Sequence, residues 1–170
     1  MKHIKVIFGD ITKATEDCIV NAANPKMLGG GGVDGAIHKA AGSKLLEACR
    51  KVKSIDGIRC PFGESRITDA GNLNAKFVIH SVGPIYRNED NPEAVLHSAY
   101  RSACELALKN QCQSIAFPAL SCGAYGYPHE KAARIALETC AKYPSLRIVF
   151  FIYDKSLLDV FSREYKKVFS

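Results

Sequence analysis

Residues 19–24, Ile-Val-Asn-Ala-Ala-Asn, and residues 29–35, Gly-Gly-Gly-Gly-Val-Asp-Gly, decide how this chain of 170 residues is interpreted. They connect an apolar run at 18–23 to a helical pattern that begins near Ala36. Glycine has no Cβ and allows positive φ, so successive N–H groups of this loop can converge on one anion. The helix that follows adds a positive dipole end and unpaired N–H donors. The pattern predicts a phosphate-binding loop flanked by side-chain amides and by the carboxylate of Asp34.

Apolar runs alternate with helical patterns along the whole chain. Strands are expected at 4–8, 18–23, 65–68, 77–82, 114–120 and 146–153. Helices are expected within 36–49 with a break at Gly42, from Asn91-Pro92, from Pro128, and near Ser156, which with Asp159 resembles a capping box. The stretch 51–62 is expected to be a surface loop. This alternation predicts an α/β protein, a three-layer α/β/α sandwich, with residues 1–170 as a single domain.

Ligands of open α/β sheets bind at the carboxyl ends of the strands. Four loops of this chain leave such ends, at 9–12, 21–34, 121–128 and 153–154. In the third loop, Gly123 and Gly126 permit close backbone approach just before a helix. Two glycine loops that face each other would hold two phosphates, so a pyrophosphate is favoured over a single phosphate.

Three side chains in these loops suggest the rest of a nucleotide. Tyr125 could cover a sugar, Tyr153 could stack on a base, and Asp10 could accept a hydrogen bond from an exocyclic amine. Each of the last two has a structural alternative. Asp10 would instead cap the turn at Thr12, and Tyr153 would instead belong to the core.

Composition limits the remaining classes of protein. The net charge of +6 favours anionic ligands, but no dense basic track suggests nucleic acid. The seven cysteines include no Cys-x-x-Cys pair, which disfavours a zinc site and favours a reducing, cytoplasmic compartment. No apolar run approaches the ~18 residues of a membrane span, and the N-terminus is too short and polar for a signal peptide.

At this point the motifs resemble a known family, the macrodomains, and within it the MacroD-type ADP-ribose hydrolases. The resemblance covers nearly the whole chain. It rests on GDIT at 9–12, IVNAAN at 19–24, GGGGVDGAIHKAAG at 29–42, VIHSVGP at 78–84, FPALSCGAYGYP at 117–128 and IYD at 152–154. It implies the macrodomain fold with a central mixed sheet and a reaction that needs no cofactor or metal. The implied partners are ADP-ribose, its 2″/3″-O-acyl esters and mono-ADP-ribosylated proteins.

The resemblance also implies a role for each motif residue. Asp10 would bind the adenine amine beside the Ile11 backbone, and Tyr153 would face the adenine. Asn24 and Asp34 would be catalytic, at the distal ribose. The other implied ligand contacts are the backbones that hold the pyrophosphate and the residues beside them: Asn21, Ala22, Gly31, Gly32, Val33, Ser121, Cys122, Gly123, Ala124, Tyr125, which packs on the distal ribose, and Gly126.

Three positions depart from the family pattern. Cys122 stands where a threonine or serine is expected, Ala124 replaces a larger aliphatic residue, and Phe62 replaces a smaller or polar one. Because the pyrophosphate is expected to bind glycines and backbone N–H groups, the cradle should survive these changes.

The leading functional hypothesis is hydrolysis of an ester on the distal ribose, for which Asp34 is the discriminating feature. The water would lie between the ligand phosphate and the ribose, and both the phosphate and Asp34 could assist its attack. A binding module without turnover is the alternative. A nucleophilic Cys122 with His38, His80 or His129 as base is disfavoured. His80 is expected to be a hydrogen-bonded core histidine, and His38 to orient the start of its helix.

Overall fold

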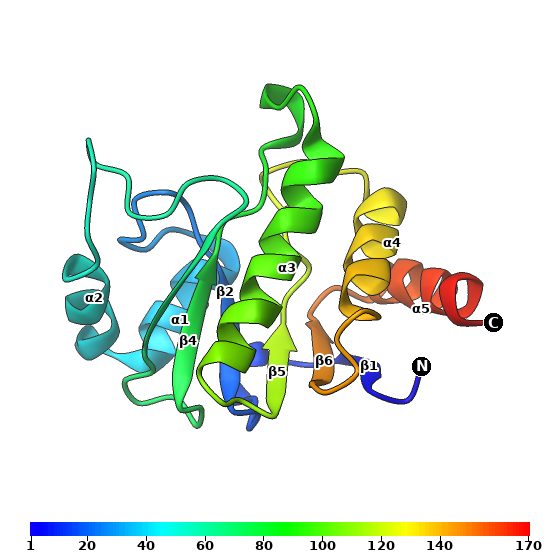
Figure 1. The fold of residues 1–170 in the computed structure, drawn as a ribbon, viewed down its shortest axis with the longest axis horizontal. Helices are drawn as coiled ribbons and strands as arrows, with labels where there is room; N and C mark the ends of the chain where they lie inside the picture. Colours follow the sequence, from blue (N-terminus) through cyan, green and yellow to red (C-terminus); the bar gives the residue numbers. More distant parts are fainter.

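Six strands form one mixed sheet in the computed structural model, which describes residues 1–170 (Figure 1). The strands are β1 (Ile4–Phe8), β2 (Cys18–Ala22), β3 (Ser65–Asp69), β4 (Phe77–Ser81), β5 (Ser114–Phe117) and β6 (Arg147–Ile152), in the order β1-β6-β5-β2-β4-β3. Every pair is parallel except β3 with β4. The mixed sheet is therefore confirmed, and its one antiparallel strand lies at an edge.

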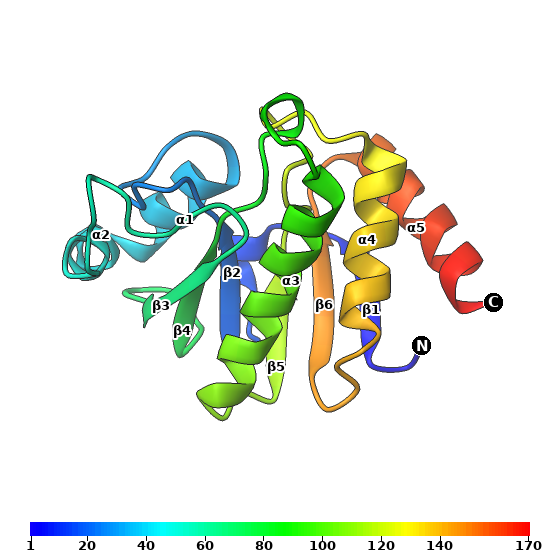
Figure 2. The same ribbon diagram turned by 45° about the horizontal axis from the view of Figure 1, so that its top comes forward.

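Helices cover both faces of this sheet (Figure 2). They are α1 (Gly32–Ala41), α2 (Ser43–Arg50), α3 (Pro92–Lys109), α4 (His129–Cys140) and α5 (Lys155–Phe169), with short 3-10 turns η1 (Ile11–Lys13) and η2 (Tyr86–Asn88). Side chains of α1 and α2 belong to one core cluster, and those of α3, α4 and α5 belong to the other. The three-layer α/β/α sandwich is confirmed.

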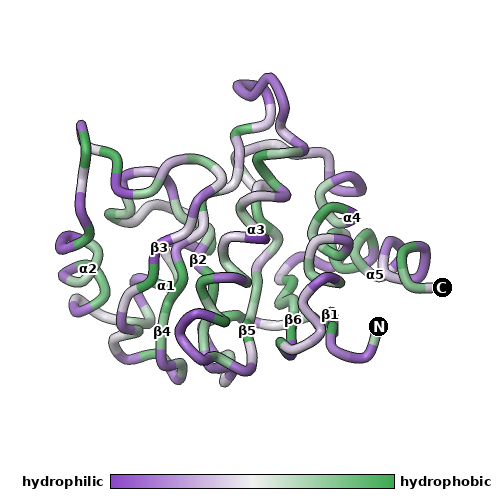
Figure 3. Tube along the Cα trace, in the orientation of Figure 1, coloured by the Kyte–Doolittle hydropathy of each residue, from purple (hydrophilic) through white to green (hydrophobic).

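The central strands are apolar on both faces because both faces are covered. Ile115 and Phe117 pack with the larger cluster, whereas Ala116 between them packs with the α1 and α2 side. Figure 3 shows the resulting pattern, with hydrophobic colour along the strands and hydrophilic colour in the outer loops. Because successive side chains of a strand point to opposite faces of the sheet, each strand residue packs against one of the two helix layers.

The main differences from the sequence prediction are at the end of β5 and at the start of α5, and other strand ends differ by one residue. The strand expected at 114–120 ends at Phe117, and the chain then leaves the sheet with Leu120 N donating to Tyr100 Oη at 2.9 Å. The proposed capping box of Ser156 and Asp159 is wrong. Asp154 is the N-cap of α5, and its Oδ1 accepts from Ser156 N at 2.8 Å, because this carboxylate stands immediately before the first helical residue.

Other expectations hold. Gly42 separates α1 from α2 with φ of 82°, and the stretch 51–62 is a loop with one isolated bridge between Ile55 and Ile58. None of the helices combines the length and the apolar character that a bilayer span requires.

The aromatic side chains of the larger cluster provide a test of the core. Phe150 is fully buried, with its ring 5.6 Å from that of Phe117 and 5.5 Å from that of Phe161. Phe150→Ala should lower the free energy of unfolding by about 3–5 kcal/mol, because it removes a buried ring and leaves a cavity. Urea unfolding measures the loss. Phe8→Ala, at a ring that is 52% exposed, is the control and should cost less than about 1 kcal/mol. Equal losses would contradict this assignment of the core.

Candidate functional site

A cavity of about 340 Å³, which we call the cleft, opens where the loops after β2 and β5 meet. Ten of the sequence-predicted site residues line it: Ala22, Asn24, Gly31, Gly32, Val33, Asp34, Ser121, Gly123, Ala124 and Tyr125. Ala23, Gly30, Gly83, Ala119 and Leu120 complete the walls. The prediction that the two glycine loops face each other is confirmed.

Glycines keep this cavity open. A Cβ added to Gly31, Gly32, Gly123 or Gly126 would meet no atom within 4 Å, so a side chain there would enter open space. Gly32 and Gly126 also have φ of 57° and 69°, which side chains rarely adopt. At Gly35, a Cβ would lie 2.6 Å from the Gly30 carbonyl oxygen, so the start of α1 packs directly against the loop.

The helices that follow the two glycine loops, α1 and α4, begin without a side-chain cap. The residue before α1 is Gly31 and the residue before α4 is Pro128, and neither has a side-chain group that could accept a capping hydrogen bond. The first N–H groups of a helix are unpaired within the helix and carry the positive end of its dipole. The glycine loop before α1, which lines the cavity, therefore offers backbone donors to an anion.

Asp34 is the carboxylate of the cavity and is only 5% exposed. Its Oδ1 accepts from Asn21 Nδ2 at 2.8 Å and lies 3.5 Å from His38 Nε2. Burial raises the pKa of Asp34, and this effect outweighs the lowering by Asn21 and His38. Both contacts use Oδ1, which leaves Oδ2 for a ligand or a water.

Asn21 lies behind Asp34 and does not line the cavity. It is fully buried, and its Nδ2 also lies 3.3 Å from His80 Nδ1, while His80 Nε2 lies 2.9 Å from Thr68 Oγ1. Because the Asn21 amide donates to two acceptors, His80 Nδ1 carries the lone pair and Nε2 carries the proton. Burial lowers the pKa of His80 to about 3, so the ring stays neutral. The expected core histidine is confirmed, and it is part of a chain that orients Asp34.

Sequence reasoning missed Thr68 in this chain. The signal that was available is its place on β3, where alternation puts it on the opposite face from Ile67. Finding its partner required the register of β3 against β4.

Asn24 has contacts within its own loop. Its Nδ2 donates to the Gly29 carbonyl oxygen at 3.2 Å, and its Oδ1 accepts from Met27 N at 3.2 Å. The side chain therefore closes the turn between β2 and the glycine run at the wall of the cavity.

The residues expected at the adenine lie outside the cavity walls. Asp10 caps η1, with Oδ1 accepting from Thr12 N at 2.9 Å and from Thr12 Oγ1 at 2.7 Å, and these bonds lower its pKa. The capping alternative is thus confirmed, while Oδ2 has no such partner. Ile11 is buried in the core on the α1 side. Tyr153 is 79% exposed, so the core alternative for this ring is wrong.

Cys122 does not have the surroundings of a nucleophile. Burial raises the pKa of its thiol to about 12, and the nearby His129 Nε2 contacts the Cys122 carbonyl oxygen at 3.0 Å, not the sulfur. All seven cysteines are free and buried, and no group of three or more His, Cys, Asp or Glu residues is placed to hold a metal ion. Gly126 and the backbone of Cys122 belong to the second glycine loop without lining the cavity.

The Macro domain family model matches residues 20–136, which include both glycine loops. The chain belongs to the Macro domain family. It is similar to the macro domain-containing protein VPA0103 of Vibrio parahaemolyticus, with 56% identity over 94% of this chain and 95% of that protein. An O-acetyl-ADP-ribose deacetylase of Citrobacter rodentium is 52% identical over 95% of this chain and 94% of its own length. A solved structure of an Oceanobacillus iheyensis macrodomain with ADP has a TM-score of 0.91 and 40% identity, covering 96% of this chain and 90% of that one.

The chain of hydrogen bonds behind Asp34 in this macrodomain makes a spectroscopic prediction. In an NMR titration, His80 should stay neutral until about pH 3, and its ¹⁵N shifts should report the Nε2–H tautomer. Thr68→Val removes the oxygen that accepts this proton at 2.9 Å and should shift the Nε2 resonance, whereas Thr68→Ser should keep the wild-type shifts. A His80 midpoint near 6.5, or identical shifts in all three proteins, would contradict this network.

The lowered pKa of His80 also predicts how the stability of the fold depends on pH. His80 has a folded pKa below its unfolded value, so only the unfolded chain binds this proton between about pH 6.5 and 3. The contribution of His80 to the free energy of unfolding is therefore present above pH 6.5 and is lost as pH falls.

Proposed function

We propose that this macrodomain binds ADP-ribose and hydrolyses ester bonds on its distal ribose. The observation that carries the proposal is a buried, oriented carboxylate, Asp34, beside two facing glycine loops. The proposed substrates are O-acetyl-ADP-ribose, which the Citrobacter rodentium relative is named for, and proteins mono-ADP-ribosylated on acidic side chains. Residues 1–170 would act as one catalytic domain.

The proposed ligand extends across the carboxyl edge of the sheet. Its pyrophosphate would accept hydrogen bonds from backbone N–H groups of the glycine loop before α1 and of the loop 121–126. The adenine would lie between Asp10, with the Ile11 backbone, and the exposed ring of Tyr153. The distal ribose would meet Asn24, Asp34 and the ring of Tyr125. Ala22 would form part of the wall, and Asn21 would act through Asp34.

The proposed reaction adds water across the ester, giving a free carboxylic acid and a ribose hydroxyl. Ionised Asp34 accepts a hydrogen bond from the water or from a ribose hydroxyl, and so fixes the direction of attack. The substrate's own phosphate can take part in holding the same water. The backbone donors of the cradle are already oriented before the ligand arrives, so they need no reorganisation during the reaction.

A binding module without turnover is the second candidate. The observation in its favour is that both polar atoms of Asn24 already bind the backbone of their own loop. The side chain would then shape the pocket without touching the reacting ester. The seven free thiols support the proposal that either activity takes place in a reducing compartment such as the cytoplasm.

Ligand affinity tests the cleft. ADP-ribose should bind one-to-one and more tightly than ADP or AMP, because AMP lacks the second phosphate and both AMP and ADP lack the distal ribose. Gly123→Val should abolish binding while leaving the melting temperature unchanged, since its side chain would enter the empty cavity from a position without positive φ. Isothermal calorimetry with the three ligands measures the affinities of both proteins, and thermal unfolding measures their melting temperatures. Equal affinities for all three would contradict the proposed orientation.

Single-turnover hydrolysis tests the two proposed catalytic residues. Asn24→Ala and Asp34→Ala should each slow hydrolysis of O-acetyl-ADP-ribose by roughly 10²-fold, the scale for a lost positioning or acid–base group. ADP-ribose binding should fall much less. A wild-type protein that binds ADP-ribose and cleaves no ester would establish the binding module instead. Full activity in Asp34→Ala would assign the activation of water to the substrate phosphate.

The pH dependence of the rate tests Asp34 in its hydrogen-bonded setting. Its pKa is raised above the usual 3.8 by burial, so a reaction that needs the carboxylate should lose activity as pH falls through that raised value. Asn21→Ala removes a hydrogen bond that favours the ionised form. The midpoint of the acid limb of the kcat profile should therefore move to higher pH. An unmoved midpoint would mean that another group sets this limb.

A further inference from the structure

The segment between α2 and β3 carries features that the proposed chemistry does not use. With Arg50 at the end of α2 and Arg66 in β3, residues 50–66 include five basic and two acidic residues, so this stretch supplies half of the net charge of +6. The same segment exposes three large apolar side chains, Ile55 at 63%, Ile58 at 38% and Phe62 at 39%. Large exposed apolar side chains within a charged rim mark interaction surfaces.

Residues 52–61 of this segment, together with Arg66 of β3, line a groove of about 570 Å³. Its walls include the apolar Val52, Ile55 and Ile58 and the basic Lys53, Arg59 and Arg66. Arg66 is paired with Glu64 at 3.1 Å, whereas Lys53 and Arg59 have no carboxylate partner, and Arg59 Nε is buried without a hydrogen bond. We call this feature the basic groove. Its charge and its apolar walls complement a ligand that is both acidic and partly apolar.

The basic groove lies beside the reacting end of the cleft. Arg59 N and Cys60 N donate to the Pro25 carbonyl oxygen at 2.8 and 3.1 Å, and Pro25 follows Asn24 directly. Further along the same segment, the ring of Phe62 lies 6.4 Å from the ring of Tyr125, which lines the cavity. Figure 1 shows the segment rising from α2 beside the loop that follows β2. The segment therefore lies beside the part of the cavity where the distal ribose is proposed to bind.

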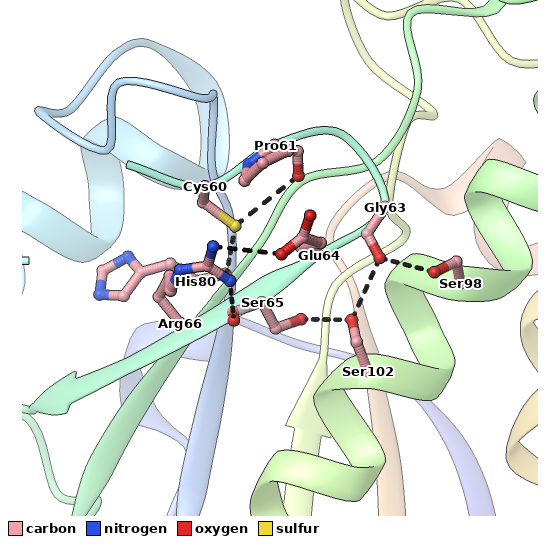
Figure 4. Close-up of polar contacts among 9 residues, drawn as sticks. All are labelled: Cys60, Pro61, Gly63, Glu64, Ser65, Arg66, His80, Ser98 and Ser102. Carbon is pink, nitrogen blue, oxygen red and sulfur yellow. Dashed lines mark hydrogen bonds and ion pairs between the residues drawn. The ribbon is translucent and has the colours of Figure 1, made fainter. Parts of the chain in front are cut away.

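The base of the segment is held firmly (Figure 4). The Gly63 carbonyl oxygen accepts from Ser98 Oγ at 2.8 Å and from Ser102 Oγ at 3.3 Å, and Gly63 N donates to the Val82 carbonyl oxygen at 2.6 Å. At the tip, the turn through Asp56 and Gly57 is closed by the bridge between Ile55 and Ile58. The groove is therefore preorganised, which lowers the entropy that a ligand must offset on binding.

We infer that the basic groove binds the polypeptide of an ADP-ribosylated protein, through an acidic and partly apolar segment that flanks the modified carboxylate. The inference rests on the proposed function and names the substrate class of the same site. Carboxylates of the bound segment pair with Lys53 and Arg59, and its apolar side chains pack on Ile55 and Ile58. O-acetyl-ADP-ribose has only an acetyl group at this end and cannot reach the groove. The groove thus separates protein substrates from the small ester.

The test compares two substrates in one pair of variants. The groove variant is Lys53→Glu with Ile55→Ser, two exposed side chains outside the cavity of the cleft. The matched control is Lys109→Glu with Leu108→Ser, which makes the same kinds of change at exposed positions near the end of α3. Each protein is assayed for kcat and KM on O-acetyl-ADP-ribose and on a protein mono-ADP-ribosylated on glutamate or aspartate.

The groove variant should raise KM for the modified protein about tenfold or more with little change in kcat, the scale for losing anchor contacts. Its kcat/KM for O-acetyl-ADP-ribose should stay within about twofold of wild type, and the control variant should match wild type on both substrates. Added salt should raise the wild-type KM for the protein alone, because ion pairs with Lys53 and Arg59 are screened.

The outcomes separate this inference from the proposed function. If wild type cleaves both substrates and the groove variant does too with unchanged KM, the inference alone is wrong. If wild type cleaves O-acetyl-ADP-ribose and leaves the modified protein intact, the inference and the protein arm of the proposed function both fail. If the groove variant lost activity equally on both substrates, its substitutions would be acting on the cleft, and the inference would be wrong. A dimer in sedimentation that the groove variant abolishes would assign the groove to a second copy of this chain.

Discussion

The site depends on one constraint, the burial of the Asp34 carboxylate behind the glycine loop. A buried carboxylate is costly unless it is hydrogen-bonded, and here the donor is Asn21. The register of the parallel pair β2 and β4 sets Asn21 directly beside His80. Thr68 of β3 then fixes the proton of the His80 ring. Three neighbouring strands are thus needed to hold one carboxylate, so the order of the sheet is a condition for the chemistry.

The loops of the cleft give up stability that an ordinary connection would have. Glycine loses more conformational entropy on folding than other residues, and a helix without a side-chain cap forgoes about 1 kcal/mol. Both costs fall where a ligand with two phosphates would bind the freed N–H groups. The larger cluster, with Phe117, Phe150 and Phe161 in contact, lies on the other face of the sheet and can offset these losses.

Most of the architecture could be predicted from sequence because the apolar residues follow a clear strand pattern in some segments and a clear helical spacing in others. The apolar run at 146–153 and the helical stripes flanking it need no tertiary information. The two glycine loops could also be predicted, since positive φ and missing side chains are properties of the residues themselves. The role of Asn21 could not, because it depends on which residue of β4 lies opposite. The cap at Asp154 and the exposure of Tyr153 depend in the same way on where a strand stops.

The single antiparallel strand explains why the basic groove and the cleft share an edge. In a parallel sheet, a chain that enters a strand does so at the edge opposite the carboxyl ends. β3 runs against β4, and its first residue, Ser65, pairs with Ser81 at the carboxyl end of β4. The connection from α2 therefore arrives at the cleft edge and passes Pro25 and Tyr125 before it joins the sheet. Reversal of one edge strand places a second recognition surface beside the reacting group and leaves the phosphate cradle unchanged.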